Sequence, residues 1–195
     1  MKVTLDNNCI IALKENEPNT PHMKRLIALY NMGTIDLKVV GIGASELQPG
    51  RIYASNFSEF KEKIAAVGLG QAEILVPIGY WDVTFWDNCI YPSEEASRLE
   101  RNIHDVLFPE IEFDYQTFCQ CRGLDPLNSG KSGETWRNRK CDVLTMWCHI
   151  AYGCDIFVTD DDNFLKTKKQ KLIDLGAGDI LTPQKAVAIL EAIQP

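Results

Sequence analysis

The stretch that decides the fold runs from Cys141 to Phe164 and reads CDVLTMWCHIAYGCDIFVTDDDNF. Its first part has the pattern of a helix that carries Asp142, and Ile156–Thr159 has the pattern of a short buried strand. That strand runs directly into three consecutive aspartates at positions 160–162. Folding alone does not explain the run, because aspartate is a poor strand residue and like charges repel. We expect a positively charged group to bind there.

The opening of the chain, MKVTLDNNCIIAL, contains a second short apolar strand that stops at Asp6. Further strand patterns at Leu37–Ile42 and Ala72–Ile78 alternate with helical patterns over 21–32 and 56–67. This alternation predicts βαβ units and a parallel sheet. Ligands bind outside the carboxyl ends of the strands in such sheets. Two strands that each deliver an acid to that edge predict one shared acidic pocket.

The remainder of the chain completes an α/β fold with a central, mostly parallel sheet. The other predicted elements are a helix near Ser93–Val106, a polar loop at Asn128–Glu134, helices over 138–152 and 163–175, a strand at Asp179–Leu181 and a closing helix from Pro183. We predict a single domain over residues 1–195, because the length fits one domain. The less regular residues 79–137 are predicted to be an insertion before the Asp142 helix.

Charge and hydrophobic pattern argue against several classes of protein. The chain has 195 residues, a formal net charge of -7 and a pI near 5.0, which argues against a protein that coats nucleic acid by bulk charge. Local basic patches and metal-bridged phosphate contacts remain compatible with that charge. The sequence contains no run of about 18 apolar residues, so it predicts no membrane span. The chain opens with a strand pattern rather than a basic and then apolar signal, so we expect a cytoplasmic protein.

The candidate site consists of acids with two amides as neutral oxygen donors. The acids are Asp6, Glu46, Asp142 and Asp161, and the amides are Asn8 and Asn163. Several carboxylates in one pocket cannot all stay ionised without a counter-charge. Mg²⁺ or Mn²⁺ is the expected partner, because both prefer oxygen ligands and keep waters for substrate phosphate. The chemistry that such a site predicts is metal-assisted hydrolysis of a phosphodiester.

Four segments in this order also carry a family resemblance. They are VTLDNN at 3–8, ASEL at 44–47, CDVLTMWCHIA at 141–151 and FVTDDDNF at 157–164. Together they resemble the PIN-domain nucleases, especially the VapC-type toxins of bacterial and archaeal toxin–antitoxin pairs. The closing ILTPQKA at 180–186 resembles the last strand and helix of that family. In this register Asp161, and not Asp160, takes the central acid position.

The resemblance implies a three-layer α/β/α PIN-like fold and metal-dependent endoribonuclease activity on RNA. It implies that Asp6, Glu46, Asp142 and Asp161 are catalytic and bind metal, with Asn163 as an outer ligand. It also implies an antitoxin protein as partner and a homodimer. The chain departs from the family at two points. Asn7 stands where the family has a small hydroxyl residue, and residues 79–137 make the chain longer than a compact toxin.

Basic and aromatic residues supply candidates for RNA contact. Three cations precede Asp142 and further cations follow the acidic run; the candidates are Arg137, Arg139, Lys140, Lys166 and Lys168. Charge runs are usually solvated faces, but clusters on both sides of an acidic pocket would hold an RNA backbone. Trp81 and Trp136 are the tryptophans that we would test for stacking on bases, against the alternative that they belong to the core.

Each candidate acid has a structural alternative. Asp6 could be only a helix N-cap, and Glu46 only a first-turn acid favoured by the helix dipole. Asp142 has the same alternative near a helix start, although its apolar neighbours make an unpaired acid costly. His149 fits a core histidine better than a general base, because metal-assisted hydrolysis needs none. For the whole chain, the alternative is a non-cleaving PIN-like RNA-binding or scaffold protein, in which residues 79–137 attach a partner.

Overall fold

The computed structural model describes residues 1–46, 56–81 and 83–193. Within these ranges the strands form one five-stranded sheet in which every pair is parallel, in the order β3-β2-β1-β4-β5. The strands are β1 Lys2–Leu5, β2 Asp36–Val40, β3 Glu73–Leu75, β4 Ile156–Val158 and β5 Asp179–Leu181. The predicted α/β fold with a mostly parallel sheet is therefore confirmed.

The order of the strands creates a switch point beside β1. The chain builds outward from β1 through β2 to β3, and later places β4 and β5 on the other side of β1. Leu5 at the end of β1 pairs with Val39 of β2 and with Val158 of β4. Ligand sites in open α/β sheets lie where the order reverses in this way. The residues that follow β1 and β4 are thus placed at the expected binding edge.

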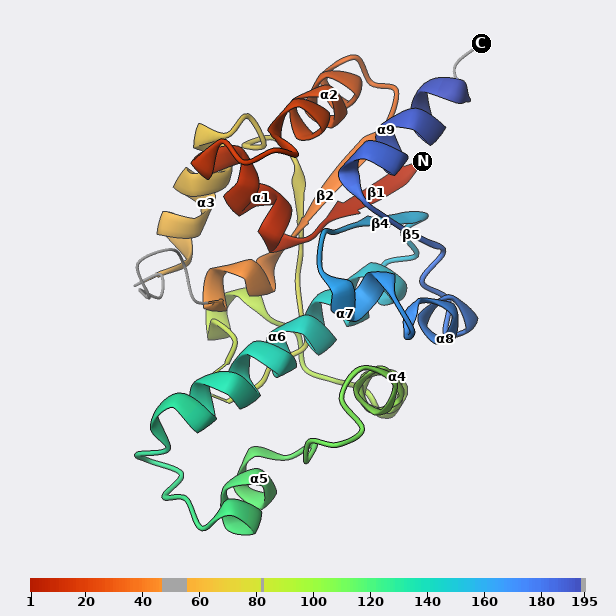
Figure 1. Ribbon diagram of the computed structural model, residues 1–195. Helices are drawn as coiled ribbons and strands as arrows, with labels where there is room; N and C mark the ends of the chain where they lie inside the picture. The colour runs from red at the N-terminus through yellow and green to blue at the C-terminus, as the bar shows by residue number, and fades with distance from the viewer. Residues whose placement is uncertain (47–55, 82, 194–195) are drawn as a thin grey trace.

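Helices cover both faces of the sheet, as Figure 1 shows. The helices α1 Asn7–Glu15, α2 Thr20–Asn31, α3 Phe57–Ala66 and α9 Pro183–Ala192 cover one face. The helices α4 Glu94–Leu107, α5 Tyr115–Arg122, α6 Gly130–Ala151, α7 Asp162–Leu165 and α8 Lys169–Asp174 lie on the other. There are also two 3₁₀ turns in the described residues. The turn η1 Gly41–Ser45 follows β2, and the turn η2 Trp86–Asn88 lies between β3 and α4. This arrangement is consistent with a three-layer α/β/α fold.

Alternation along the strands explains the two layers. Ile156 and Val158 of β4 pack into the core below α1, α2, α3 and α9, whereas Phe157 between them packs into the other core. Successive strand side chains point to opposite faces, so a strand with three apolar residues in a row is covered on both sides. All three of these residues are at most 1% exposed. The short apolar runs in the sequence reflect this double burial.

Helix α6 begins earlier than its sequence suggests. The expected polar loop at Asn128–Glu134 is wrong, because the helix starts at Gly130 and places Asp142 in its middle, not near its start. Gly133 lies inside the helix at a close approach, where an added Cβ would lie 2.9 Å from the hydroxyl of Tyr115 on α5. Tertiary packing against α5 therefore offsets the poor helix propensity of the Gly/Ser-rich segment.

Two other local expectations differ from the structure. Helix α5 was not anticipated, although Asp114 caps it through the Thr117 N–H and Gly123 ends it with a φ of 62°. The single helix expected over 163–175 is two helices, because the backbone leaves the helical region at Lys166. Glu46, which could be a first-turn acid, directly follows the 3₁₀ turn η1, and residues 47–55 lie outside the described residues.

A buried ion pair fastens α4 to α6. Lys140 donates from Nζ to Oε1 of Glu100 on α4 at 2.8 Å, and both side chains are almost fully buried. The Lys140 ammonium also lies 3.8 Å from the ring centroid of Phe113 and 4.4 Å from that of Tyr80. The prediction that Lys140 contacts RNA is wrong, because its charge is enclosed by these groups.

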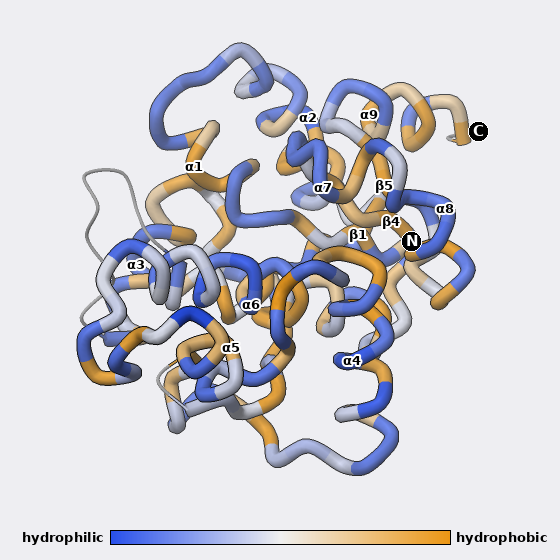
Figure 2. The backbone as a smooth tube through the Cα atoms, turned by 60° about the horizontal axis from the view of Figure 1, so that its bottom comes forward, coloured by the Kyte–Doolittle hydropathy of each residue, from blue (hydrophilic) through white to orange (hydrophobic). Residues whose placement is uncertain are grey.

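The tube in Figure 2 is largely hydrophilic along α4, yet the helix contributes a narrow buried stripe. That stripe is Glu100, Ile103, His104 and Leu107. Their spacing of three and four residues places them on one helical face, which packs against α6. Among all the described residues, no helix is both long enough and apolar enough to cross a membrane.

We expect Glu100→Gln to destabilise the protein by roughly 3 kcal/mol, because it leaves the Lys140 charge buried without a counter-ion. The matched control is Glu191→Gln, which breaks the exposed pair with Arg25 and costs less than about 1 kcal/mol. Urea unfolding measures both. Equal free energies of unfolding for the two variants would contradict the account of how α4 is attached to α6.

Candidate functional site

The four predicted acids come from four separate segments that meet at the carboxyl edge of the sheet. Asp6 follows β1 directly, and Asp161 follows β4 after Thr159 and Asp160. Glu46 follows η1, which continues from the end of β2. Asp142 lies in the middle of α6, and α6 packs against η1. The sheet topology, rather than sequence proximity, therefore brings these carboxylates to one place.

Asp6 is held by hydrogen bonds to both of its carboxylate oxygens. Its Oδ1 accepts from the backbone N–H of Asn7 at 2.7 Å, so it caps α1 as the structural alternative requires. Its Oδ2 accepts from the hydroxyl of Thr159 at 2.6 Å. The residue is 7% exposed. Capping α1 therefore occupies only Oδ1 of Asp6, and Oδ2 is turned toward Thr159 at the end of β4.

Thr159 is the centre of this network. Its hydroxyl donates its one proton to Asp6 and accepts from the Asp161 N–H at 3.0 Å and from Nδ2 of Asn8 at 3.1 Å. A hydroxyl has one donor and two lone pairs, so the capacity of Thr159 is filled. The amide orientation of Asn8 is thereby fixed with its nitrogen toward Thr159. Its Oδ1 is buried and has no hydrogen-bond partner among the described residues.

Glu46 is oriented by Asn7. The Nδ2 of Asn7 donates to Oε2 of Glu46 at 2.7 Å, and Asn7 is 6% exposed. This contact depends on a close approach at Gly43 in η1, where an added Cβ would lie 2.9 Å from Oδ1 of Asn7. The amide at position 7, where the resembled family has a small hydroxyl residue, thus reaches across to a candidate acid.

Asp161 and Asn163 form a second local unit at the start of α7. Oδ1 of Asp161 accepts from the Asn163 backbone N–H at 2.7 Å, and Oδ2 accepts from the Asn163 side chain at 3.3 Å. The flanking acids are exposed: Asp160 accepts from Asn19, and Asp162 pairs with Lys166. These two flanking acids are therefore solvated charges.

Asp142 and Asn163 line the same hollow of about 290 Å³ with two of the predicted cations, Arg139 and Lys168. Arg139 lies three residues before Asp142, so the two share a face of α6. The guanidinium of Arg139 and the ammonium of Lys168 lie 5.3 and 4.9 Å from the ring centroid of Phe108. Arg139 also pairs with Glu110 at 3.7 Å. Positive charge is therefore placed beside the acids.

Burial and mutual repulsion raise the pKa values of three of the acids. Burial, and then the nearby charges of Asp161 and Asp160, raise the pKa of Asp6 to about 6, against the lowering effect of its hydrogen bonds. Burial and the charge of Asp6 raise the pKa of Glu46 to about 8. Burial and the charges of Glu46, Asp6 and Asp161 hold the pKa of Asp142 well above its usual range. The acids thus act on one another electrostatically.

The donor set fits a hard divalent cation, since it consists of carboxylate and amide oxygens without sulfur. The partnerless Oδ1 of Asn8 adds a buried acceptor to that set. As they stand, the described residues contain no group of three or more His, Cys, Asp or Glu side chains that could hold a metal ion. The acids therefore lie in one neighbourhood without converging on a single point.

The other predicted residues occupy varied positions. Arg137 is half-buried and donates to the Ser45 carbonyl oxygen at 3.3 Å, beside Glu46. Lys166 is exposed in its pair with Asp162. His149 is fully buried and bonds Thr4 and Ala177, and burial lowers its pKa to about 4. It is a core histidine, as the sequence favours.

Sequence reasoning missed the roles of Thr159 and Asn7. Thr159 was visible as the last residue of a strand, but its contact with Asp6 spans 153 residues of sequence. Asn7 reaches Glu46 across 39 residues. Local patterns do not encode such pairings. Comparisons with family models, curated proteins and solved structures found no match to the chain, so the case for a site depends on this geometry.

We expect Asp142→Asn to raise the melting temperature in EDTA by about 2–4 °C for each 1 kcal/mol of repulsion removed. Folded carboxyls with raised pKa values bind more protons than unfolded ones, so the stability of the metal-free protein falls as the pH rises from about 4 to 8. The variant should flatten that fall. Asp160→Asn, at an exposed neighbour, is the control. Identical melting curves for wild type and Asp142→Asn from pH 5 to 8 would contradict the arrangement.

Proposed function

We propose that the chain is a divalent-metal-dependent endoribonuclease of the PIN-like kind, which hydrolyses RNA phosphodiester bonds with Mg²⁺ or Mn²⁺. One observation carries the proposal: acids from four segments lie at the switch point of a parallel sheet, where burial and the neighbouring carboxylate charges raise the pKa values of Asp6, Glu46 and Asp142. A protein gains no stability from buried like charges, so the arrangement is retained for a ligand of opposite charge. The order of the motifs resembling PIN-domain nucleases supports the same assignment.

Asp6, Glu46, Asp142 and Asp161 would hold the ion, with Asn163 in support. When bound, a divalent ion supplies a low-pKa water and neutralises charge that develops on the phosphate. The chain's own groups orient the acids. Thr159 fixes the carboxylate of Asp6, and Asn7 fixes that of Glu46. Such outer hydrogen bonds set the direction of each acid before an ion enters.

The hollow beside Asp142 gives the substrate a place for its backbone. Arg139 and Lys168 both line it, and their side chains rest on the Phe108 ring. A protein with a formal charge of -7 repels RNA at long range, so binding depends on such local cations. Together the two cations and the acids bring a phosphate next to the candidate ion.

The resemblance extends the proposal to biological context. A VapC-like role makes the chain the toxin of a toxin–antitoxin pair in the cytoplasm, with an antitoxin protein that covers the acids and a homodimer as the assembly. Light scattering on the purified chain checks the last point, because a particle of 22.0 kDa would be a monomer. The rival is a non-cleaving PIN-like RNA-binding or scaffold protein, which the same experiments separate from a nuclease.

We expect the purified protein to cut a mixed RNA pool with Mn²⁺ and not with EDTA. Asp6→Asn and Asp142→Asn should each lower the cleavage rate by more than about 100-fold, because each removes an inner ligand. Thr159→Val keeps the side-chain shape, removes the hydrogen bond to Asp6 and should cost about 10–100-fold.

Asp160→Asn is the matched control and should leave cleavage unchanged, because that side chain is exposed and bonded to Asn19. Cleavage that persists in Asp142→Asn would contradict the site. RNA binding without any metal-dependent cleavage would favour the non-cleaving rival.

A further inference from the structure

Two large aromatic side chains are exposed in the segment that precedes α4. Trp81 is 73% exposed and Trp86 is 62% exposed. Their rings meet edge to face, with centroids 5.6 Å apart. Tryptophan is normally mostly buried, so paired exposed indoles mark a surface that binds something.

The segment that presents these indoles is tied down by hydrogen bonds. The Tyr80 N–H donates to the hydroxyl of Thr84 at 2.8 Å, and that hydroxyl donates back to the Tyr80 carbonyl at 3.1 Å. The Gly79 N–H donates to the Ile90 carbonyl at 2.7 Å. Trp86 begins the 3₁₀ turn η2, and its ring packs close to Gly79. The indoles are thus held in position before any ligand arrives, which limits the entropy lost on binding.

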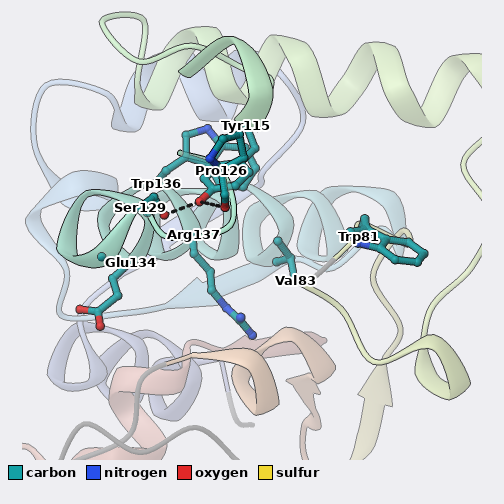
Figure 3. A pocket seen from close by; sticks show the side chains of 10 residues that line it. Trp81, Val83, Tyr115, Pro126, Ser129, Glu134, Trp136 and Arg137 are labelled. Carbon is teal, nitrogen blue, oxygen red and sulfur yellow. Dashed lines mark hydrogen bonds between the residues drawn. The ribbon is translucent and has the colours of Figure 1, made fainter. Parts of the chain in front are cut away.

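Two hollows lie beside the indoles and share the residues Val83 and Arg137. The first, of about 270 Å³, reaches from Trp81 to Tyr115. Figure 3 shows Val83 between Trp81 and Arg137, with the Arg137 side chain extending from α6 toward η1. The second hollow, of about 200 Å³, includes Trp86 and ends at Ser45, the residue before Glu46. The two hollows adjoin at Val83 and Arg137, so together they form a path from Trp81 to Ser45, which directly precedes Glu46.

We propose that Trp81, Trp86 and Arg137 form a binding site for the unpaired bases of single-stranded RNA. The inference rests on the proposed nuclease function, because that function places an RNA phosphate at the end of the path. Exposed aromatic rings stack on any base, and an arginine plane adds stacking and positive charge. Bases in a duplex are already stacked and paired, so this site selects unpaired segments.

In this proposal, the bases and the backbone of the RNA lie against different faces of α6. Gly130, Gly133 and Arg137 line the first hollow and recur at helical spacing on one face. Thr135, Asn138 and Asp142 line the hollow with the basic groups and recur on another face. Bases would lie on the indole side and the backbone on the side of Arg139 and Lys168.

Trp136 does not belong to this stacking surface. It is 3% exposed, and its indole N–H donates to the Glu112 carbonyl oxygen at 2.9 Å. Its ring packs on Tyr115 at a centroid distance of 4.9 Å. Of the two alternatives for Trp136, the structure therefore supports the core residue, and its ring forms the floor beneath the first hollow.

The test measures binding of fluorescein-labelled oligouridylate to the full chain in EDTA, so that no cleavage occurs. Trp81→Ala and Trp86→Ala should each weaken binding by about five- to a hundredfold, and Trp81→Phe should retain most of the affinity. Tyr91→Ala is the control, since Tyr91 is 96% exposed and lines neither hollow. An abasic sugar-phosphate oligomer of the same length should bind weakly and equally to wild type and both alanine variants.

Oligouridylate affinities that are unchanged in both alanine variants would overturn the inference, as would a wild-type protein that binds the abasic oligomer equally well. The first result would leave a protein-docking surface as the explanation for the indoles. Failure of the proposed function is distinguishable, because it shows as absence of Mn²⁺-dependent cutting by wild type. Tryptophan-dependent binding without cutting would keep the base site and remove the nuclease.

Discussion

Repulsion among carboxylates at the end of a parallel sheet is the constraint on which the rest of the site depends. Asp6 and Asp161 are carried there by neighbouring strands, and Glu46 and Asp142 approach from η1 and α6. Burial and the neighbouring carboxylate charges raise the pKa values of Asp6, Glu46 and Asp142. The fold tolerates this because hydrogen bonds from neighbouring polar groups fix several of the acids in direction. Binding of the proposed cation would relieve this repulsion and stabilise the folded protein.

Helix α6 contributes both an acid and basic residues to the candidate site. Asp142 lies in the middle of α6, and the basic residues before it differ in their surroundings. Lys140 is enclosed by Glu100 and aromatic rings, whereas Arg139 lines the hollow beside the acids. Arg137 reaches toward η1 on another face. Helices α4 and α5 are therefore part of the site's construction, since both pack against α6.

Much of the fold could be predicted from the sequence, because short apolar runs bounded by turns specify doubly covered strands. The strand Asp179–Leu181 has the predicted limits, and β1 ends directly before Asp6 as predicted. The first half of α6 could not be predicted, because packing against α5 overrides the Gly/Ser-rich composition. Asp6 and Asp161 could be singled out because each follows a strand. The Thr159 and Asn7 contacts, and the burial of Lys140, depend on residues distant in sequence and leave no local pattern.

The most direct test of the central claim is isothermal titration of the purified chain with Mn²⁺ at neutral pH. If the four carboxylates form one cation site, wild type and Asp160→Asn bind Mn²⁺ alike. Asp6→Asn and Asp142→Asn should each lose the binding, and Glu46→Gln should weaken it. Equal Mn²⁺ affinities for wild type and Asp142→Asn, or no binding by wild type, would show that the acids at this edge do not act as one site.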